Sequence, residues 1–355
     1  MLSVALFVTG GSLGLAYYLS LEHLLVTAPP ENIIVVSKGA GSEIEGSLEL
    51  ESARKLELLD GIKREGDPLA ARELVAQAYL APPNYKHYEA PRTLRGIDAD
   101  SVAVHRVTLV QGVAPAAGSL EVIVGKRLAA RFKLAVGGAL ALPAGSSKIV
   151  GVFDADGSSF EDEVWTPRAA LELHSKLTDT SSVTIVAQSV GGVPDLIDRI
   201  NANKDLDAHA ATVAAYRSNG AGLATIARTV LVLLVLLATV ATFVIAMTMN
   251  AAVLLRMAEF GSLAAIGIRR GVLARIVLVE SALLGVIGAV VGMLASLLIA
   301  NRLGAIPLGA NPVELAMPAI VIVVGLALGV MVGVIGGVVP ALQVSRLNVL
   351  EALRS

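Results

Sequence analysis

The chain has 355 residues, of which 55% are hydrophobic and 16% charged, and its mean hydropathy is +0.72. This composition is too apolar for an ordinary soluble protein and too charged for one that lies in a membrane throughout, so we expect two kinds of region. The net charge of -2 gives no global attraction to nucleic acid. Cysteine is absent, which excludes disulfides, thiolate metal sites and a cysteine nucleophile.

The first segment, residues 1–27, contains an uncharged apolar run long enough to cross a bilayer, and Tyr17 and Tyr18 near its end suit the interface. The alternative is a cleaved signal peptide, because Val26-Thr27-Ala28 resembles a small-residue cleavage site. No basic residue precedes the run, and this favours a retained transmembrane helix.

Residues 28–221 differ completely, since they hold most of the charge and no run long enough to span a membrane. Helical patterns and short β-like runs alternate there, separated by turn formers, which predicts an α+β domain of one unit or two subdomains, strand-rich at about 109–177. The β-like runs are 32–37, 102–110, 120–124, 139–142, 149–153, 164–166 and 183–187, and the helical patterns are about 49–60, 69–78, 125–133, 168–176 and 194–203.

Three further apolar segments, 222–250, 272–300 and 316–339, predict transmembrane helices two to four. A charged segment at 251–271 separates the first two of these, a short loop at 301–315 separates the last two, and a tail occupies 340–355. Cations are concentrated in and just after the 251–271 segment and in the tail, which the positive-inside rule places in the cytoplasm. We therefore expect an α-helical membrane protein with four transmembrane helices and a large extracytoplasmic α+β domain between helices one and two.

Glycines recur every four residues in the fourth predicted helix and twice in the third. Such a face permits close approach of helix backbones, and its partner is either another helix of this chain or a second copy. The helix-packing candidates are Gly288, Gly292, Gly325, Gly329, Gly333 and Gly337.

The sequence shows no catalytic constellation. It lacks the GxxxxGK[ST] loop that ATP hydrolysis would need, the HExxH metal pattern and the GxSxG nucleophile elbow. Its five histidines have no metal-ligand spacing, so no metal site is predicted. Glu280, about one turn inside the third helix, is either a functional carboxylate in the membrane or one that snorkels or pairs with an arginine such as Arg275.

The segment from Arg256 to Gly267 predicts a short helix. Glu259 and Leu263 are spaced i, i+4, Phe260 and Ile266 are available for an apolar contact, and Gly267 suits the C-cap. The pattern fits a helix lying on lipid or a helix that docks into a groove on a cytoplasmic partner, and it does not decide between the two.

This segment resembles the one after the second membrane helix in the MacB/FtsX-type ABC transporter permeases. The residues that carry the resemblance are, in order, Arg256, Glu259, Gly261, Ala265, Gly267, Arg269 and Glu280. The tail from Pro340 to Arg354, ending in Glu-Ala-Leu-Arg, is similar to that of the family, as is the order of one helix, a large domain and three helices. The chain departs from the family at Met257 and Ala258, where a second charged residue is usual beside the glutamate.

The resemblance implies a permease subunit of the bacterial inner membrane, without its own ATPase site, that acts as a pair, expected to be a homodimer. ATP and Mg would be bound by a separate ATP-binding subunit. The permease would contact that subunit through the ATPase-coupling residues Arg256, Glu259, Phe260, Gly261, Leu263 and Gly267. Some members also use a periplasmic adaptor and an outer-membrane component. The implied function is to convert ATP-driven motion into movement of the periplasmic domain, for export or for lipid or lipoprotein trafficking. The alternative is a non-transporting regulator that activates a cell-wall hydrolase or signals.

Overall fold

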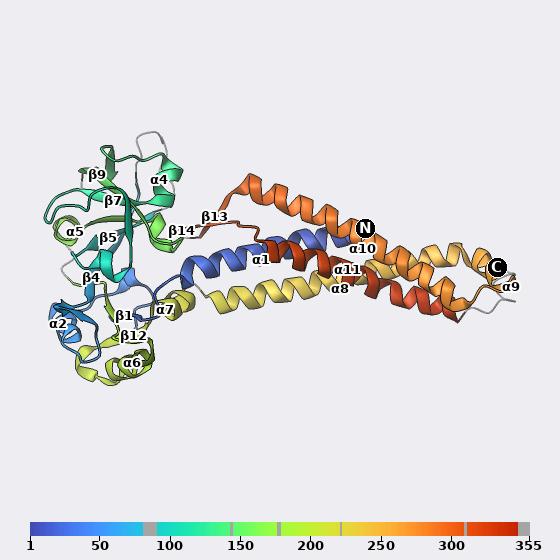
Figure 1. Ribbon diagram of the computed structural model, residues 1–355, viewed down its shortest axis with the longest axis horizontal. Coiled ribbons are helices and arrows are strands. Elements are labelled where there is room, and N and C mark those ends of the chain that lie inside the picture. Colours follow the sequence, from blue (N-terminus) through green and yellow to red (C-terminus); the bar gives the residue numbers. More distant parts are fainter. Residues whose placement is uncertain (81–90, 143–144, 176–178, 221, 309–310, 347–355) are drawn as a thin grey trace. The chain divides into compact units, whose positions relative to one another are not determined.

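The computed structural model describes residues 1–80, 91–142, 145–175, 179–220, 222–308 and 311–346 (Figure 1). The chain divides into two compact units. A helical unit comprises Met1–Ser20, Ala224–Ile306 and Glu314–Ser355, and a sheet unit comprises Leu21–Leu223 and Pro307–Val313.

The helical unit is built from long apolar helices. Within the described residues, four helices are long and apolar enough to cross a membrane, as the sequence predicted: α1 (Leu2–Val26), α8 (Leu223–Leu255), α10 (Arg270–Leu303) and α11 (Ala319–Ser345). A short helix, α9 (Met257–Ala265), lies between α8 and α10 in the chain.

The last helix extends further than the sequence indicated. Pro340 lies inside α11, where we expected the tail to begin, and the helix continues to Ser345. Proline is tolerated in such helices because neighbouring groups satisfy the freed backbone carbonyl. Ala341 and Val344 are buried in the helical core, so packing holds the final turns. The Glu-Ala-Leu-Arg motif at 351–354 lies outside the described residues.

The glycine faces pack against helices of the same chain. A Cβ atom on Gly333 would lie 2.7 Å from Cα of Gly285, and one on Gly329 would lie 2.6 Å from Cβ of Ala289, both on α10. Cβ atoms on the remaining predicted glycines would meet α1 or the facing helix at similarly short range, at Gly288, Gly292, Gly325 and Gly337. Real Cβ atoms do not approach backbone atoms this closely, so Gly288, Gly292 and Gly333 require glycine with the backbones where they are. At Gly325 the nearest atoms are the side-chain ends of Ser12 and Met293.

The sheet unit is organised around one mixed sheet, which in the described residues has ten strands. The strand order is β12-β1-β11-β4-β5-β10-β7-β9-β6, with β8 paired to β9, and the pairs β5–β10 and β7–β9 are parallel while the others are antiparallel. The bounds are β1 (Asn32–Ser37), β4 (Ala70–Ala78), β5 (Arg92–Ile97), β6 (Thr108–Gly112), β7 (Val122–Gly125), β8 (Ala139–Leu142), β9 (Gly145–Asp154), β10 (Val164–Pro167), β11 (Ser182–Val186) and β12 (Ala208–Thr212). Two short hairpins, β2 (Arg64–Glu65) with β3 (Asp67–Pro68) and β13 (Ala305–Leu308) with β14 (Asn311–Glu314), stand apart from this sheet.

Strand β4 joins two halves of this sheet. Its first residues pair with β11 and its last residues pair with β5. One half buries apolar side chains against α2 (Leu50–Glu57) and α6 (Val193–Ala202), and the other against α4 (Lys126–Phe132) and α5 (Arg168–Ser175). A further buried cluster, which includes Phe153, Phe160 and Trp165, also lies in this unit. Two short helices, α3 (Ser101–Val104) and α7 (Val213–Gly220), complete the unit.

Three local predictions were wrong or incomplete. The expected helix at 69–78 is strand β4, the expected strand at 102–110 is helix α3 followed by β6, and strands β5 and β12 were missed. The error at β4 has a physical cause. Glu73 suggests a solvent-facing position of an amphipathic helix, but the side chain is fully buried against Arg95 of β5. The charge is therefore compensated by a residue that is distant in the sequence.

Candidate functional site

The segment between α8 and α10 is held in place by Arg256, the N-cap residue of α9. Its Nε lies 3.3 Å from Oε2 of Glu259, and its Nη1 lies 3.2 Å from Oε2 of Glu280 on α10. Glu280 therefore pairs with an arginine, but the partner is Arg256 rather than the nearby Arg275. One guanidinium ties the start of α9 to α10.

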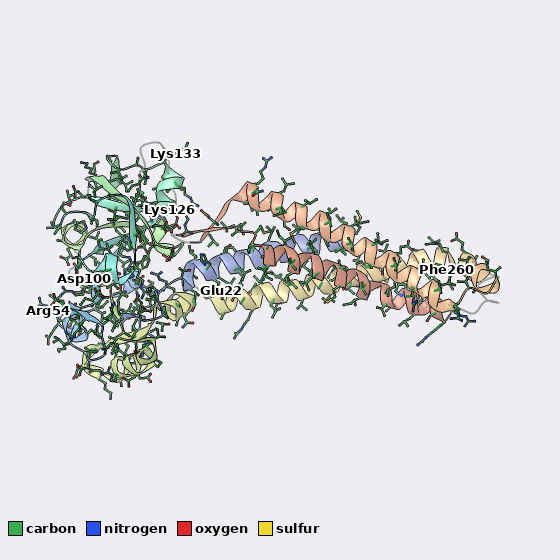
Figure 2. The ribbon with its side chains drawn as sticks, in the orientation of Figure 1. Glu22, Arg54, Asp100, Lys126, Lys133 and Phe260 are labelled. Carbon is green, nitrogen blue, oxygen red and sulfur yellow. The ribbon has the colours of Figure 1, made fainter. Side chains whose placement is uncertain are left out.

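Phe260 fixes the inner side of α9. The side chain is 2% exposed and belongs to the same core as Val253, Leu273 and Val277 (Phe260 is labelled in Figure 2). The guanidinium carbon of Arg256 lies 5.3 Å from the centre of its ring, a cation–π contact. Phe260 therefore packs in the core of its own chain, and its predicted contact with an ATP-binding subunit stays a prediction. The neighbouring Gly261 is also buried.

The carboxyl end of α9 is closed by Gly267, as the sequence predicted. Its φ of +98° suits glycine, and its N–H donates to the carbonyl of Ala264 at 3.2 Å. The N–H of Ile268 donates to the carbonyl of Leu263, also at 3.2 Å. These two bonds form a Schellman motif, and both Leu263 and Ile268 pack against the helical core. The helix is therefore anchored at both ends and along one face.

The opposite face of α9 is exposed. It carries the carboxylate of Glu259, the hydroxyl of Ser262 and the aliphatic side chain of Ile266, which is 78% exposed. Arg269, Arg270 and Arg275 are exposed beside it, and none of them forms an ion pair with another described residue. A short fixed helix with an apolar tip and a basic rim can bind an acidic protein surface or anionic headgroups.

No chemistry is visible at this segment. Among the described residues, no group of three or more His, Asp or Glu side chains could hold a metal ion.

A second polar cluster, which sequence reasoning missed, lies inside the sheet unit. Arg95 is 1% exposed and pairs with Glu73 at 2.8 Å, Glu163 at 2.8 Å and Glu43 at 3.0 Å. His105 Nε2 lies 2.8 Å from the second oxygen of Glu73. Arg92 and Arg95 in an otherwise β-like segment were the available signal, since a charge inside a strand has to find a counter-charge.

The electrostatics of this cluster depend on Arg95. Burial alone would raise the pKa of Glu43, but the charge and hydrogen bonds of Arg95 outweigh it and lower the pKa to about 2. Burial also acts to raise the pKa of Glu73, and the charges of His105 and Arg95 outweigh it, so that this pKa too is lowered. Both carboxylates are therefore ionised at neutral pH.

Comparison with known proteins covers most of the chain. Residues 1–203 match the MacB-like periplasmic core domain, and residues 231–349 match the FtsX-like permease C-terminal domain. Among curated proteins, none matches the chain.

Two solved structures are similar to part of the chain. One is the periplasmic region of MacB from Actinobacillus actinomycetemcomitans, with 13% identity and a TM-score of 0.41, covering 55% of this chain and 93% of that one. The other is the extracellular domain of the noncanonical ABC-type transporter YknZ from Gram-positive bacteria, with 16% identity and a TM-score of 0.39, covering 51% of this chain and all of that one.

Proposed function

Because the chain belongs to the MacB/FtsX-type family of ABC transporter permeases, we propose that it converts ATP-driven motion of a separate ATP-binding subunit into movement of its extracytoplasmic domain. It is a multi-pass membrane subunit, and the domain between α1 and α8 is extracytoplasmic. ATP and Mg would be bound by the partner subunit. The observation that carries the proposal is the anchoring of α9 by Arg256 and Phe260, which leaves Glu259 and Ile266 facing outward.

The chain order supports this role. One crossing, α8, separates the extracytoplasmic domain from α9, so α9 lies on the cytoplasmic side, where an ATP-binding subunit is found. Helix α8 has 33 residues and is continuous, which corresponds to a length of about 50 Å. A displacement of α9 is therefore passed to α8 directly and to α10 through the Arg256–Glu280 pair.

The exposed face of α9 gives a sharp test. The full chain and its ATP-binding subunit are purified together in lipid nanodiscs, and subunit binding and ATPase activity are measured for Ile266→Asp. We expect binding to weaken by about 10-fold or more, since a charge would replace an apolar interface contact. Leu58→Asp makes the same chemical change at a side chain of the sheet unit that is 73% exposed, and it should leave binding unchanged. Equal binding by both variants would contradict docking through α9.

We propose that this motion serves export or the trafficking of lipids or lipoproteins. Two copies of the chain would act together, with an adaptor and an outer-membrane component as further partners. The non-transporting alternative is activation of a cell-wall hydrolase. Deletion of the gene separates the two, because loss of a regulator alters cell separation, whereas loss of a transporter alters sensitivity to exported compounds or the placement of lipids.

A further inference from the structure

A cavity of about 220 Å³ opens in the sheet unit beside the buried arginine cluster. Its walls come from the last turn of α1, from the segment around the 3-10 helix Glu43–Glu45, from β4 and β5, and from α7. One side is apolar, with Leu25, Ile44 and Val75. The other side is polar and carries two arginines and two glutamates, which are Arg95, Arg217, Glu43 and Glu163.

Arg217 is the cation in this wall with unused hydrogen-bonding capacity. Its guanidinium carbon lies 4.2 Å from the ring centre of Phe160, and Nη1 donates to Oγ of Ser159 at 3.1 Å. Among the described residues, no carboxylate lies within ion-pair distance of it. A guanidinium has five N–H donors, and the described residues provide one acceptor, Ser159, for this arginine, which lines the cavity. Burial lowers the pKa of Arg217.

Tyr216, the neighbour of Arg217 on α7, adds a second unsatisfied group. Its hydroxyl oxygen is buried and has no hydrogen-bond partner among the described residues. A buried hydroxyl without a partner is unfavourable, so a polar ligand in the cavity would stabilise it.

The carboxylates in the wall can also accept further bonds. Oε2 of Glu43 accepts one described hydrogen bond, from Arg95 at 3.3 Å. Oε1 of Glu163 likewise accepts one, from Arg95 at 3.0 Å. Each ionised carboxylate oxygen can accept about two, so both retain capacity for a cationic donor.

Charge balance selects the kind of ligand. The wall itself carries two arginines and two glutamates, and Glu73, behind Arg95, also lies 2.8 Å from His105. A lone anion or cation would add an uncompensated charge to this site. A ligand with one positive and one negative group leaves the balance unchanged and satisfies both sets of unused groups. The apolar side of the cavity then receives an aliphatic group.

We propose that this cavity binds a small zwitterion of the α-amino acid type with an aliphatic side chain. Its carboxylate is bound by Arg217 and Tyr216, its ammonium by Glu43 and Glu163, and its side chain by Leu25, Ile44 and Val75. The proposal goes beyond the coupling function and needs no ATP-binding subunit, so the two stand or fall separately.

The chain carries its own reporter for a test. Trp165 is the only tryptophan, and its Nε1 donates to Glu163 at 2.9 Å. The full chain in nanodiscs is titrated with L-leucine, 4-methylpentanoate, which lacks the ammonium, and 3-methylbutylamine, which lacks the carboxylate. We expect a saturable change of Trp165 fluorescence with L-leucine, and about 10-fold or weaker binding of each analogue, since each loses a charge-assisted contact.

Variants test whether Arg217 and Tyr216 contact the bound L-leucine. Arg217→Gln should weaken L-leucine binding by about 10-fold or more. Arg199→Gln, at an exposed arginine of α6, should not change it. Tyr216→Phe keeps the ring and should weaken binding by a few-fold, which keeps the test valid if Arg217→Gln fails to fold. The proposal is overturned if L-leucine gives no saturable change, if either analogue binds as tightly as L-leucine, or if folded Arg217→Gln binds L-leucine normally.

Discussion

The helical unit and the sheet unit are each stabilised internally by a different kind of interaction. In the helical unit, backbones approach so closely that glycine is needed at positions such as Gly333, and most charged residues lie at or near helix ends. In the sheet unit, an arginine and three carboxylates are enclosed in the interior. The stability of the first unit should therefore depend on side-chain volume, and that of the second on charge and pH.

The largest effect is expected from Arg95→Met. The variant leaves three carboxylates buried without their common cation, and removing one partner of a buried ionic network costs about 3–5 kcal/mol. Unfolding of the sheet unit is followed by Trp165 fluorescence during denaturant titration of the full chain. The matched control is Arg199→Met, whose exposed pair with Asp195 contributes at most about 1 kcal/mol, so the midpoint should change far less. Similar midpoints for the two variants would show that the network is dispensable.

The sheet unit should become less stable as the pH falls. The pKa of Glu43 is lowered from 4.5 to about 2, so its stabilising contribution is complete above about pH 4.5 and is lost as pH falls towards 2. The lowered pKa of Glu73 acts in the same direction. For Glu43 the loss is on the order of 3 kcal/mol. Denaturant midpoints measured between pH 7 and pH 3 should fall for the unmodified chain and fall less steeply for Glu43→Gln.

The corresponding test for the helical unit is to add side-chain volume at a glycine. The added Cβ of Gly333→Ala would lie 2.7 Å from Cα of Gly285, so the helices must move apart, at about 1–3 kcal/mol. Gly271→Ala is the control, because no atom outside its own helical turn lies within 4 Å of its added Cβ. The Tm of the full chain in detergent should fall for Gly333→Ala and stay level or rise for Gly271→Ala. Equal Tm values would mean that the glycine face is not tightly packed.

The smallest effect concerns the pair that links α9 to α10. The side chains of Arg256 and Glu280 are 42% and 44% exposed, so their coupling energy should be about 0.5–1 kcal/mol. A double-mutant cycle of Arg256→Gln and Glu280→Gln measures this coupling energy. The corresponding cycle with Arg275→Gln should give no coupling. Coupling of Glu280 to Arg275 and not to Arg256 would contradict the Arg256–Glu280 pair.

Sequence reasoning succeeded where a pattern is local. The length and apolarity of the four long helices, the glycine spacing in α11 and the C-cap at Gly267 are all encoded in neighbouring residues. It failed where the partner is far along the chain. The local pattern predicts a helix at 69–78, but this segment is strand β4, in which Glu73 is compensated by Arg95 of another strand.

The candidate site shows the same limit. The order of Arg256, Glu259, Gly267 and Glu280 marked the segment, but nothing in the sequence shows that Phe260 faces the core while Ile266 faces outward. Both are apolar, Phe260 within α9 and Ile266 at its C-cap. The choice depends on where α10 and α11 pack, which is a property of the fold.

The most direct test of coupling is a distance measured in both nucleotide states. The chain has no cysteine, so Leu173→Cys and Leu303→Cys, both at exposed positions, introduce two spin-label sites without further changes. Distances between the labels are measured by pulsed electron paramagnetic resonance on the complex with its ATP-binding subunit, without nucleotide and with ATP and vanadate. We predict a shift between the two states that disappears in Ile266→Asp. An unchanged distance in a complex that hydrolyses ATP would contradict the proposal that nucleotide-driven motion reaches the extracytoplasmic domain.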